Sequence, residues 1–235
     1  MDIVYAATRN LYPHMLPTIT SLLEHNDPNM IYVLAEDDDL PFEIPAPHEI
    51  INVSGQTIFP STGPNYRSMF TYMAMMRACY VDLLPVDRVI QLDIDTIVCD
   101  SLLPIWETDM TGKWFSACEE IYARYKPFGK RYYNIGVCLF NLQQMRADNI
   151  VPTMVKELNA NYHLCLEQDM LNLYGVPAHV VPMERRFNEC RMCGYTDHPA
   201  VVHYAGYPDW YRNPLMDRAE YLLKYKRMSY VNRHR

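Results

Sequence analysis

Residues 88–100, Arg-Val-Ile-Gln-Leu-Asp-Ile-Asp-Thr-Ile-Val-Cys-Asp, constrain this chain more than any other stretch. The apolar run at 89–92 predicts a buried strand, and Asp93 and Asp95 follow it directly. Side chains of an extended backbone alternate, so both carboxylates lie on one side and Ile94 on the other. Paired carboxylates suit Mg²⁺ or Mn²⁺, which complete their coordination shell with water and phosphate. A solvated strand end is the simpler explanation, but charge beside a buried strand is costly unless something compensates it, which favours a functional site.

Composition restricts the classes of protein to which the chain can belong. Its 235 residues, 49% of them apolar, suffice for one α/β domain with a full core. The net charge of −7 argues against a nucleic-acid binder but not against a phosphorylated ligand, because local potential and bound metal decide that. The chain begins directly with a strand pattern and has no apolar run of membrane-spanning length. Its seven scattered cysteines are unlike a secreted disulfide framework, so we expect a cytoplasmic location.

The first hundred residues read as parallel strand–helix units. Apolar runs at 3–7 and 30–35 predict two strands, and the helical pattern between them ends near residue 26. This order implies a parallel pair with a right-handed crossover, so a ligand is expected beyond the carboxyl ends of the strands, near residues 6–12. Two further elements precede residue 88, a strand at 49–53 and a helix at 67–84 whose buried face carries Met69, Met73, Met76, Tyr80 and Leu84.

The second half mixes short elements around a strand at 133–142. Gly136 inside this strand suggests close approach by a ligand or another backbone, and Asn134 stands at its entrance. The stretch 119–132 has no clear period and reads as a loop that could cover a site. The remaining predictions are short strands at 96–98, 113–118, 178–181 and 200–203, a helix start at 100–101, and helices at 145–162, 167–173 and 209–227, the last broken at Pro214.

Taken in order, the motifs resemble those of glycosyltransferase family 8, the retaining GT-A enzymes related to glycogenin and the bacterial lipopolysaccharide galactosyltransferases. The resemblance covers nearly the whole chain. It rests on the first strand Ile3-Val4-Tyr5-Ala6-Ala7 with Asn10 and Tyr12, on Arg77, on Leu92-Asp93-Ile94-Asp95, on Asp100-Ser101-Leu102 with Trp106, on Asn134-Ile135-Gly136-Val137, on Glu167-Gln168-Asp169 with Asn172, on Arg186-Phe187-Asn188 and on His203-Tyr204-Ala205-Gly206.

The resemblance implies a fold and a division of the chain. The expected fold is a single α/β GT-A domain, a Rossmann-like nucleotide-diphospho-sugar transferase with a mixed central sheet. Within the domain spanning residues 1–235, we expect residues 1–100 to form the nucleotide-binding half, 101–210 the sugar and acceptor half, and 211–235 a basic C-terminal helix and tail.

The resemblance also implies a reaction, the transfer of glucose or galactose from a UDP-sugar to a hydroxyl of a glycan, glycolipid or other acceptor. A Mn²⁺ or Mg²⁺ ion held by Asp93, Asp95 and His203 would offset the charge that develops on the departing UDP. Gln168 would lie beneath the anomeric carbon, beside Glu167. An amide is a poor nucleophile, so same-face attack is favoured over a covalent adduct.

The expected contacts fall into three groups. The nucleotide would be bound by Ala6, Ala7, Thr8, Asn10, Tyr12, Asp93, Ile94 and Asp95, with the ring of Tyr12 stacking on the base unless it is a plain packing residue. The sugar would be bound by Arg77, Asn134, Gly136, Glu167 and Gln168. The diphosphate would be bound by His203 and Gly206.

The chain departs from the family pattern at three places. Thr8 stands where the first strand often carries an aspartate, and Glu167 replaces the usual aspartate beside the glutamine. The family ending Gly-x-x-Lys-Pro-Trp appears as residues 206–211, Gly-Tyr-Pro-Asp-Trp-Tyr, without the lysine. A diphosphate contact is therefore missing unless Arg212 or Lys126 replaces it.

Other interpretations of the same residues stay open. Leu-Asp-Ile-Asp-Thr also resembles motif I of haloacid dehalogenase-like phosphatases, with Asp93 as nucleophile and Asp95 as general acid. The lost lysine could instead mark a degenerate transferase that only binds sugar. Cys190 and Cys193, with His198 nearby, could hold zinc, although one such pair supplies only part of a four-ligand site. The basic stretch 221–235 is a solvated helix and tail or a peripheral contact with an anionic membrane at its inner face.

Overall fold

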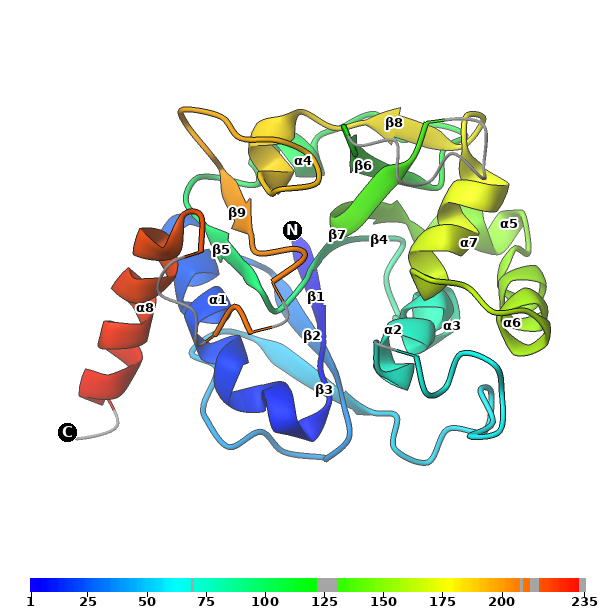
Figure 1. Ribbon diagram of the computed structural model, residues 1–235, viewed down its shortest axis with the longest axis horizontal. Coiled ribbons are helices and arrows are strands. Elements are labelled where there is room, and N and C mark those ends of the chain that lie inside the picture. The colour runs from blue at the N-terminus through cyan, green and yellow to red at the C-terminus, as the bar shows by residue number, and fades with distance from the viewer. Residues whose placement is uncertain (69, 122–130, 208, 212–215, 233–235) are drawn as a thin grey trace.

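The computed structural model describes residues 1–68, 70–121, 131–207, 209–211 and 216–232. Seven strands form one mixed sheet in the order β3-β2-β1-β4-β7-β6-β8 (Figure 1). The strands are β1 (Asp2–Ala6), β2 (Met30–Ala35), β3 (His48–Asn52), β4 (Arg88–Leu92), β6 (Phe115–Glu119), β7 (Tyr133–Asn141) and β8 (Val180–Pro182).

The direction of the strands changes in the middle of the sheet. Strands β3, β2, β1 and β4 run parallel to one another, whereas β7 is antiparallel to both of its neighbours, β4 and β6. The first parallel pair is joined through α1 (Tyr12–His25), as the strand–helix–strand pattern predicts. The mixed central sheet expected from the sequence is therefore confirmed.

The sheet carries a core on each face because its strands are buried on both sides. Ile3 and Tyr5 of β1 pack with α1, while Val4 between them joins the core on the other face. That second core is built with α2 (Tyr72–Met76), α3 (Tyr80–Leu83), α5 (Leu142–Ala147), α6 (Val151–Ala160) and α7 (Leu166–Gly175).

A two-stranded ribbon lies beside the main sheet. It pairs β5 (Thr96–Val98) with β9 (Val201–His203) in antiparallel register, so that Thr96 stands opposite His203. The ribbon contributes Ile97 and Val202 to a small core with the C-terminal helix α8 (Ala219–Asn232), which runs alongside α1 (Figure 1). Two further short elements are α4 (Leu103–Trp106) and the 3-10 turn η1 (Arg9–Leu11).

The predicted helix at 67–84 is wrong in its extent and its continuity. Thr71 has an extended backbone and α2 begins only at Tyr72. The 3-10 turn η2 (Arg77–Cys79) then separates α2 from α3. The buried face itself is confirmed, because Met73, Met76, Tyr80 and Leu84 are all buried. Met69 lies outside the described residues.

Two other helix predictions need correction. The helix expected at 145–162 is two helices, α5 and α6, because Asn149 takes a left-handed backbone with φ 50° and Pro152 stands in the first turn of α6. The terminal helix expected at 209–227 begins at Ala219, and Pro214 lies outside the described residues. Most of the loop predicted at 119–132 also lies outside the described residues. Near its two ends, the Glu120 N–H donates a hydrogen bond to the carbonyl of Tyr132 at 2.9 Å.

Candidate active site

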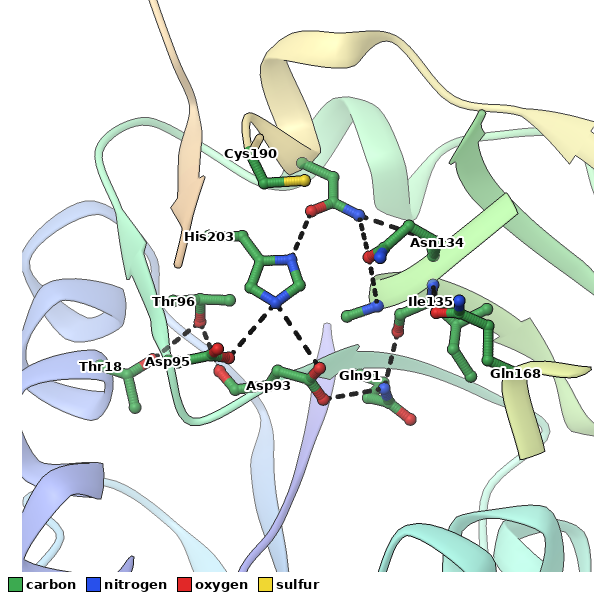
Figure 2. Close-up of polar contacts among 12 residues, drawn as sticks. Thr18, Gln91, Asp93, Asp95, Thr96, Asn134, Ile135, Gln168, Cys190 and His203 are labelled. Atoms are coloured by element: carbon green, nitrogen blue, oxygen red, sulfur yellow. Dashed lines mark hydrogen bonds and ion pairs between the residues drawn. The ribbon is translucent and has the colours of Figure 1, made fainter. Parts of the chain in front are cut away.

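The turn between β4 and β5 presents Asp93 and Asp95 at the carboxyl end of β4. Two backbone hydrogen bonds hold this turn, from Asp93 N to Gly136 O at 2.7 Å and from Tyr204 N to Asp95 O at 2.9 Å. The first bond ties the turn to β7 and the second ties it to the end of β9. Both aspartates are thereby placed next to His203, as Figure 2 shows.

Asp93, Asp95 and His203 form one cluster in which the three ligand atoms all lie within 4.8 Å of one another. The Nε2 atom of His203 is 3.3 Å from Asp95 Oδ1 and 3.7 Å from Asp93 Oδ2. The histidine is almost fully buried, while the two aspartates are partly exposed. Two hard carboxylate oxygens and one imidazole nitrogen, open on one side, fit Mn²⁺ or Mg²⁺. The residues predicted to bind metal therefore converge, and no other such cluster exists in the part of the chain that the structure describes.

The electrostatics of the cluster also favour a cation. Burial raises the pKa of Asp93, and the nearby charge of Asp95 adds to the shift while Arg77 and His203 oppose it. Burial opposes charge on His203, yet Asp95 raises its pKa well above the ordinary value, with help from Cys190. The same carboxylates that favour positive charge on His203 would favour a divalent cation bound between them.

Gly136 is required by the packing of His203. A Cβ atom at this position would lie 2.1 Å from Cε1 of the imidazole and 2.7 Å from Nδ1. The close approach predicted for this glycine is therefore made by the side chain of His203. Gly136 is not among the residues that line the two cavities described below, and its contact with a sugar stays a prediction.

Arg77 connects two acidic groups across the site. It projects from η2 and forms ion pairs with Asp93 and with Glu167 in the first turn of α7. Burial raises the pKa of Glu167 to about 7, although the guanidinium of Arg77 opposes the shift. The arginine is thus paired with a carboxylate from each of two different elements.

Gln168 is held by the strand that it faces. Its Oε1 accepts a hydrogen bond from the Ile135 N–H at 3.0 Å, and its Nε2 donates to Tyr132 Oη at 3.1 Å. Asn134 donates through Nδ2 to Glu120 Oε1 at 3.0 Å. These side chains come from α7, from β7 and from the segment that follows β6, and all are buried.

Two adjoining cavities meet at the cluster of Asp93, Asp95 and His203. The first, of about 360 Å³, is lined by Phe70, Ala74, Arg77, Asp93, Asp95, Glu120, Asn134, Leu164, Cys165, Glu167, Gln168, Met192, His203, Ala205 and Gly206. The second, of about 530 Å³, is lined by Ala6, Ala7, Thr8, Leu11, Phe70, Thr71, Met73, Ala74, Arg77, Asp93, Ile94, Asp95, Gly206, Tyr207, Trp210 and Tyr211. Both volumes suit a small-molecule ligand. The residues predicted to bind the sugar fall mostly in the first cavity and those predicted to bind the nucleotide mostly in the second.

Two predicted nucleotide contacts lie away from the cavity lining. Tyr12 is 2% exposed, and its hydroxyl accepts a hydrogen bond from Glu36 N at 2.7 Å. Asn10 is exposed and accepts a hydrogen bond from Thr8 Oγ1 at 2.7 Å. The packing alternative for Tyr12 agrees with this placement, and stacking on a base stays a prediction.

Similarity to known proteins identifies the family. The model of the family described as Glycosyl transferase family 8 matches residues 2–211. The chain belongs to glycosyl transferase family 8.

Two curated relatives come from Streptococcus pneumoniae. Glycosyltransferase GlyF is 27% identical over 235 residues, covering 88% of this chain, and glycosyltransferase GlyA is 25% identical over 240 residues, covering 92%. The chain spans 56% of the length of GlyF and 32% of the length of GlyA.

Two solved structures show the same fold. Galactosyltransferase LgtC, in complex with donor and acceptor sugar analogues, is 22% identical with a TM-score of 0.70, and the match covers 96% of this chain and 95% of that one. The bifunctional glycosyltransferase WbbM is 15% identical with a TM-score of 0.76, and the match covers 96% of this chain and 49% of that one. The GT-A fold expected from the sequence is confirmed.

Family 8 membership resolves some of the alternatives. It replaces the phosphatase interpretation of Asp93 and Asp95. Among the described residues, Cys190 and Cys193 belong to no group of three or more metal-ligating side chains, and His198 is exposed. Lys126 and Arg212, the two candidates to replace the family lysine, lie outside the described residues.

Some residues of the site were not predicted from the sequence. Phe70 borders both cavities, and Glu120 lines the first. Trp210 and Tyr211 line the second cavity, although sequence analysis treated them only as part of the altered family ending. Two aromatic residues next to the position of the missing lysine were the sequence signal that could have indicated a contact with the ligand.

Proposed function

We propose that this member of glycosyl transferase family 8 transfers glucose or galactose from a UDP-sugar, with retention of anomeric configuration, in a reaction that depends on Mn²⁺ or Mg²⁺. The observation that carries the proposal is the convergence of Asp93, Asp95 and His203 at the junction of the two cavities. A bound divalent cation supplies positive charge to the diphosphate of the leaving nucleotide. Asp93, Asp95 and His203 would hold the ion, with the diphosphate next to His203 and Gly206.

The chain's own residues would orient the sugar. Arg77, Asn134 and Glu167 all line the first cavity, so each could contact the sugar hydroxyls. Gln168 lines the same cavity, and its carbonyl oxygen already accepts the Ile135 N–H. This bond lowers the nucleophilicity of an already weak amide and supports same-face attack by the acceptor. Gln168 would then stabilise the positive charge that develops at the anomeric carbon.

The nucleotide would occupy the second cavity. Ala6, Ala7 and Thr8 lie at the end of β1, where parallel strands commonly bind ligands. The aromatic rings of Trp210 and Tyr211 add apolar surface to the lining of the same cavity. The division into residues 1–100 for the nucleotide and 101–210 for the sugar and acceptor stays a proposal, because Arg77 also lines the first cavity and Trp210 the second.

The acceptor is proposed to be a glycan, a glycolipid or another lipid-linked hydroxyl. Among the described residues no helix is long and apolar enough to cross a membrane. Contact with the inner face of an anionic membrane through the basic C-terminal segment stays a proposal. Lys224 in that segment already pairs with Glu24 at 2.8 Å, and Arg233 and Arg235 lie outside the described residues.

The test measures release of UDP from UDP-glucose and UDP-galactose, in Mn²⁺ and after chelation, for the wild type and Asp95→Ala. We expect turnover of one donor in Mn²⁺ and a loss of roughly 100-fold or more in the variant, because a ligand to the charge-stabilising ion is removed. Asp27→Ala is the matched control, since Asp27 is an exposed aspartate before β2, at the opposite end of the strands. Proton NMR of the product reads its anomeric configuration.

Other outcomes would contradict the proposal in distinct ways. Binding of UDP in Mn²⁺ without turnover of either sugar would indicate another donor sugar or a non-catalytic sugar-binding module. Absence of any metal-dependent nucleotide binding would refute the proposed donor site as a whole.

A further inference from the structure

The side chain of Asn188 contacts Nδ1 of His203, the ring nitrogen that does not face the aspartates. The proposed reaction gives Asn188 no role. Asn188 ends the 3-10 turn η4 (Arg185–Asn188) and is fully buried. Its Oδ1 lies 2.8 Å from Nδ1 of His203, and its Nδ2 lies 2.9 Å from Oδ1 of Asn134. One amide therefore bridges a proposed metal ligand and a proposed sugar contact.

Backbone hydrogen bonds keep this amide at a constant position relative to the ribbon. The residue after Asn188, Glu189, donates its N–H to Val201 O at 2.9 Å and accepts from His203 N at 2.8 Å. The residue two before it, Arg186, accepts from Ala200 N at 2.7 Å. Asn188 thus moves with β9, the strand that carries His203.

The orientation of each group in the chain of contacts follows from a backbone donor. Gly136 N–H can only donate, and it points at the Oδ1 of Asn134 at 3.0 Å, so that atom is the carbonyl oxygen of the amide. The atom of Asn188 that faces this oxygen must then be its Nδ2, which donates. The other end of Asn188, its Oδ1, faces His203 and can only accept. Glu120 agrees with this order, because its Oε1 accepts a hydrogen bond from Asn134 Nδ2.

The consequence for His203 is a single assignment of its two ring nitrogens. Nδ1 must carry a proton in order to donate to Asn188. Nε2, the atom that points at Asp93 and Asp95, is then the nitrogen available to bind a metal (Figure 2). Partners that hold the second nitrogen of a metal-binding histidine commonly affect metal affinity 10- to 100-fold.

We propose that Asn188 is a positioning residue for the metal centre, which directs Nε2 of His203 toward the cation and joins the orientation of His203 to that of Asn134. This inference rests on the proposed function, because it needs a metal at Asp93, Asp95 and His203. The coupling means that the metal ligand and the sugar-side asparagine are aligned by one hydrogen-bonded chain that begins at a backbone amide of β7.

The experiment titrates Mn²⁺ into the nucleotide-free protein and measures free ion by electron paramagnetic resonance. Asn188→Leu removes both hydrogen bonds, and we expect its Mn²⁺ dissociation constant to rise roughly 10- to 100-fold. Asn188→Asp keeps an acceptor for Nδ1–H but loses the donor to Asn134. We therefore expect Asn188→Asp to bind Mn²⁺ within about threefold of the wild type while its KM for the donor rises.

A matched control separates positioning from general destabilisation. Asn65 is equally buried, and its amide makes three hydrogen bonds to the backbone of residues Leu158, Asn161 and His163, away from the metal cluster. Asn65→Leu should lower the melting temperature without changing the Mn²⁺ dissociation constant.

The outcomes distinguish this inference from the proposed function. Wild-type Mn²⁺ affinity in folded Asn188→Leu, or a Mn²⁺ loss in Asn65→Leu as large as that in Asn188→Leu, would overturn the positioning role alone. Weak Mn²⁺ binding by folded Asn188→Asp would overturn it too, even if Asn188→Leu does not fold. No Mn²⁺ binding by the wild type would refute the metal centre itself.

Discussion

At the scale of single residues, the contact between Gly136 and His203 is the most demanding in the site. A Cβ atom at residue 136 would overlap the imidazole, with 2.1 Å to Cε1, and the hydrogen bond between Nδ1 and Asn188 restrains the ring from moving away. Gly136→Ala should therefore displace His203 and weaken Mn²⁺ binding roughly tenfold or more. Titration calorimetry with Mn²⁺ measures the effect. Gly55→Ala is the control, because a Cβ there meets nothing within 4 Å, and unchanged affinity in Gly136→Ala would contradict the prediction.

At the scale of elements, the ion pair between Arg77 and Glu167 joins η2 to the first turn of α7. The folded chain keeps the Glu167 proton up to a pKa of about 7, whereas the unfolded chain releases it near 4.5. The folded state binds more protons between these values, so its free energy of unfolding falls as the pH rises, by roughly 3 kcal/mol in all.

Glu167→Gln removes this ionisation and should make the free energy of unfolding less dependent on pH. Urea denaturation of the metal-free protein at pH 5 and pH 8 measures the difference. From pH 5 to pH 8 the free energy of unfolding should fall more in the wild type than in Glu167→Gln. Glu49→Gln changes an exposed residue of β3 and should behave as the wild type does. Equal losses in wild type and Glu167→Gln would show that Glu167 ionises in the folded chain as readily as in the unfolded one.

At the scale of the whole molecule, the metal cluster joins parts of the chain that are distant in sequence. Asp93 and Asp95 follow β4 of the main sheet, whereas His203 ends β9 of the ribbon, whose other side packs against α8. Only the folded chain brings these ligands together. A cation that binds there should therefore stabilise the whole fold.

Mn²⁺ at a hundred times its dissociation constant should add about 2.7 kcal/mol to the free energy of unfolding, and chelation should remove it. Thermal unfolding with and without Mn²⁺ measures the shift in melting temperature. Asp95→Ala should show little or no shift. A shift of wild-type size in that variant would place the stabilising ion elsewhere on the protein.

Local sequence patterns were enough to predict the strands, the order of the motifs and the paired carboxylates of Asp93 and Asp95. Apolar runs and alternation are local signals, so the strands near residues 3–7, 30–35 and 89–92 could be predicted within one residue at either end. His203 joined the two aspartates only through the family resemblance, because no local pattern connects residues so distant in the chain.

How these pieces meet depends on the packing of the folded chain. The break in the helix predicted at 67–84 places Arg77 on a 3-10 turn that pairs with Asp93 and with Glu167, 90 residues further along the chain. The hydrogen bond between Asn188 and His203 and the fit of Gly136 against the same ring likewise depend on strand order and on the path of the ribbon. Periodicity reports which face of an element is buried, whereas contacts between side chains depend on how the elements pack, and sequence patterns do not carry that information.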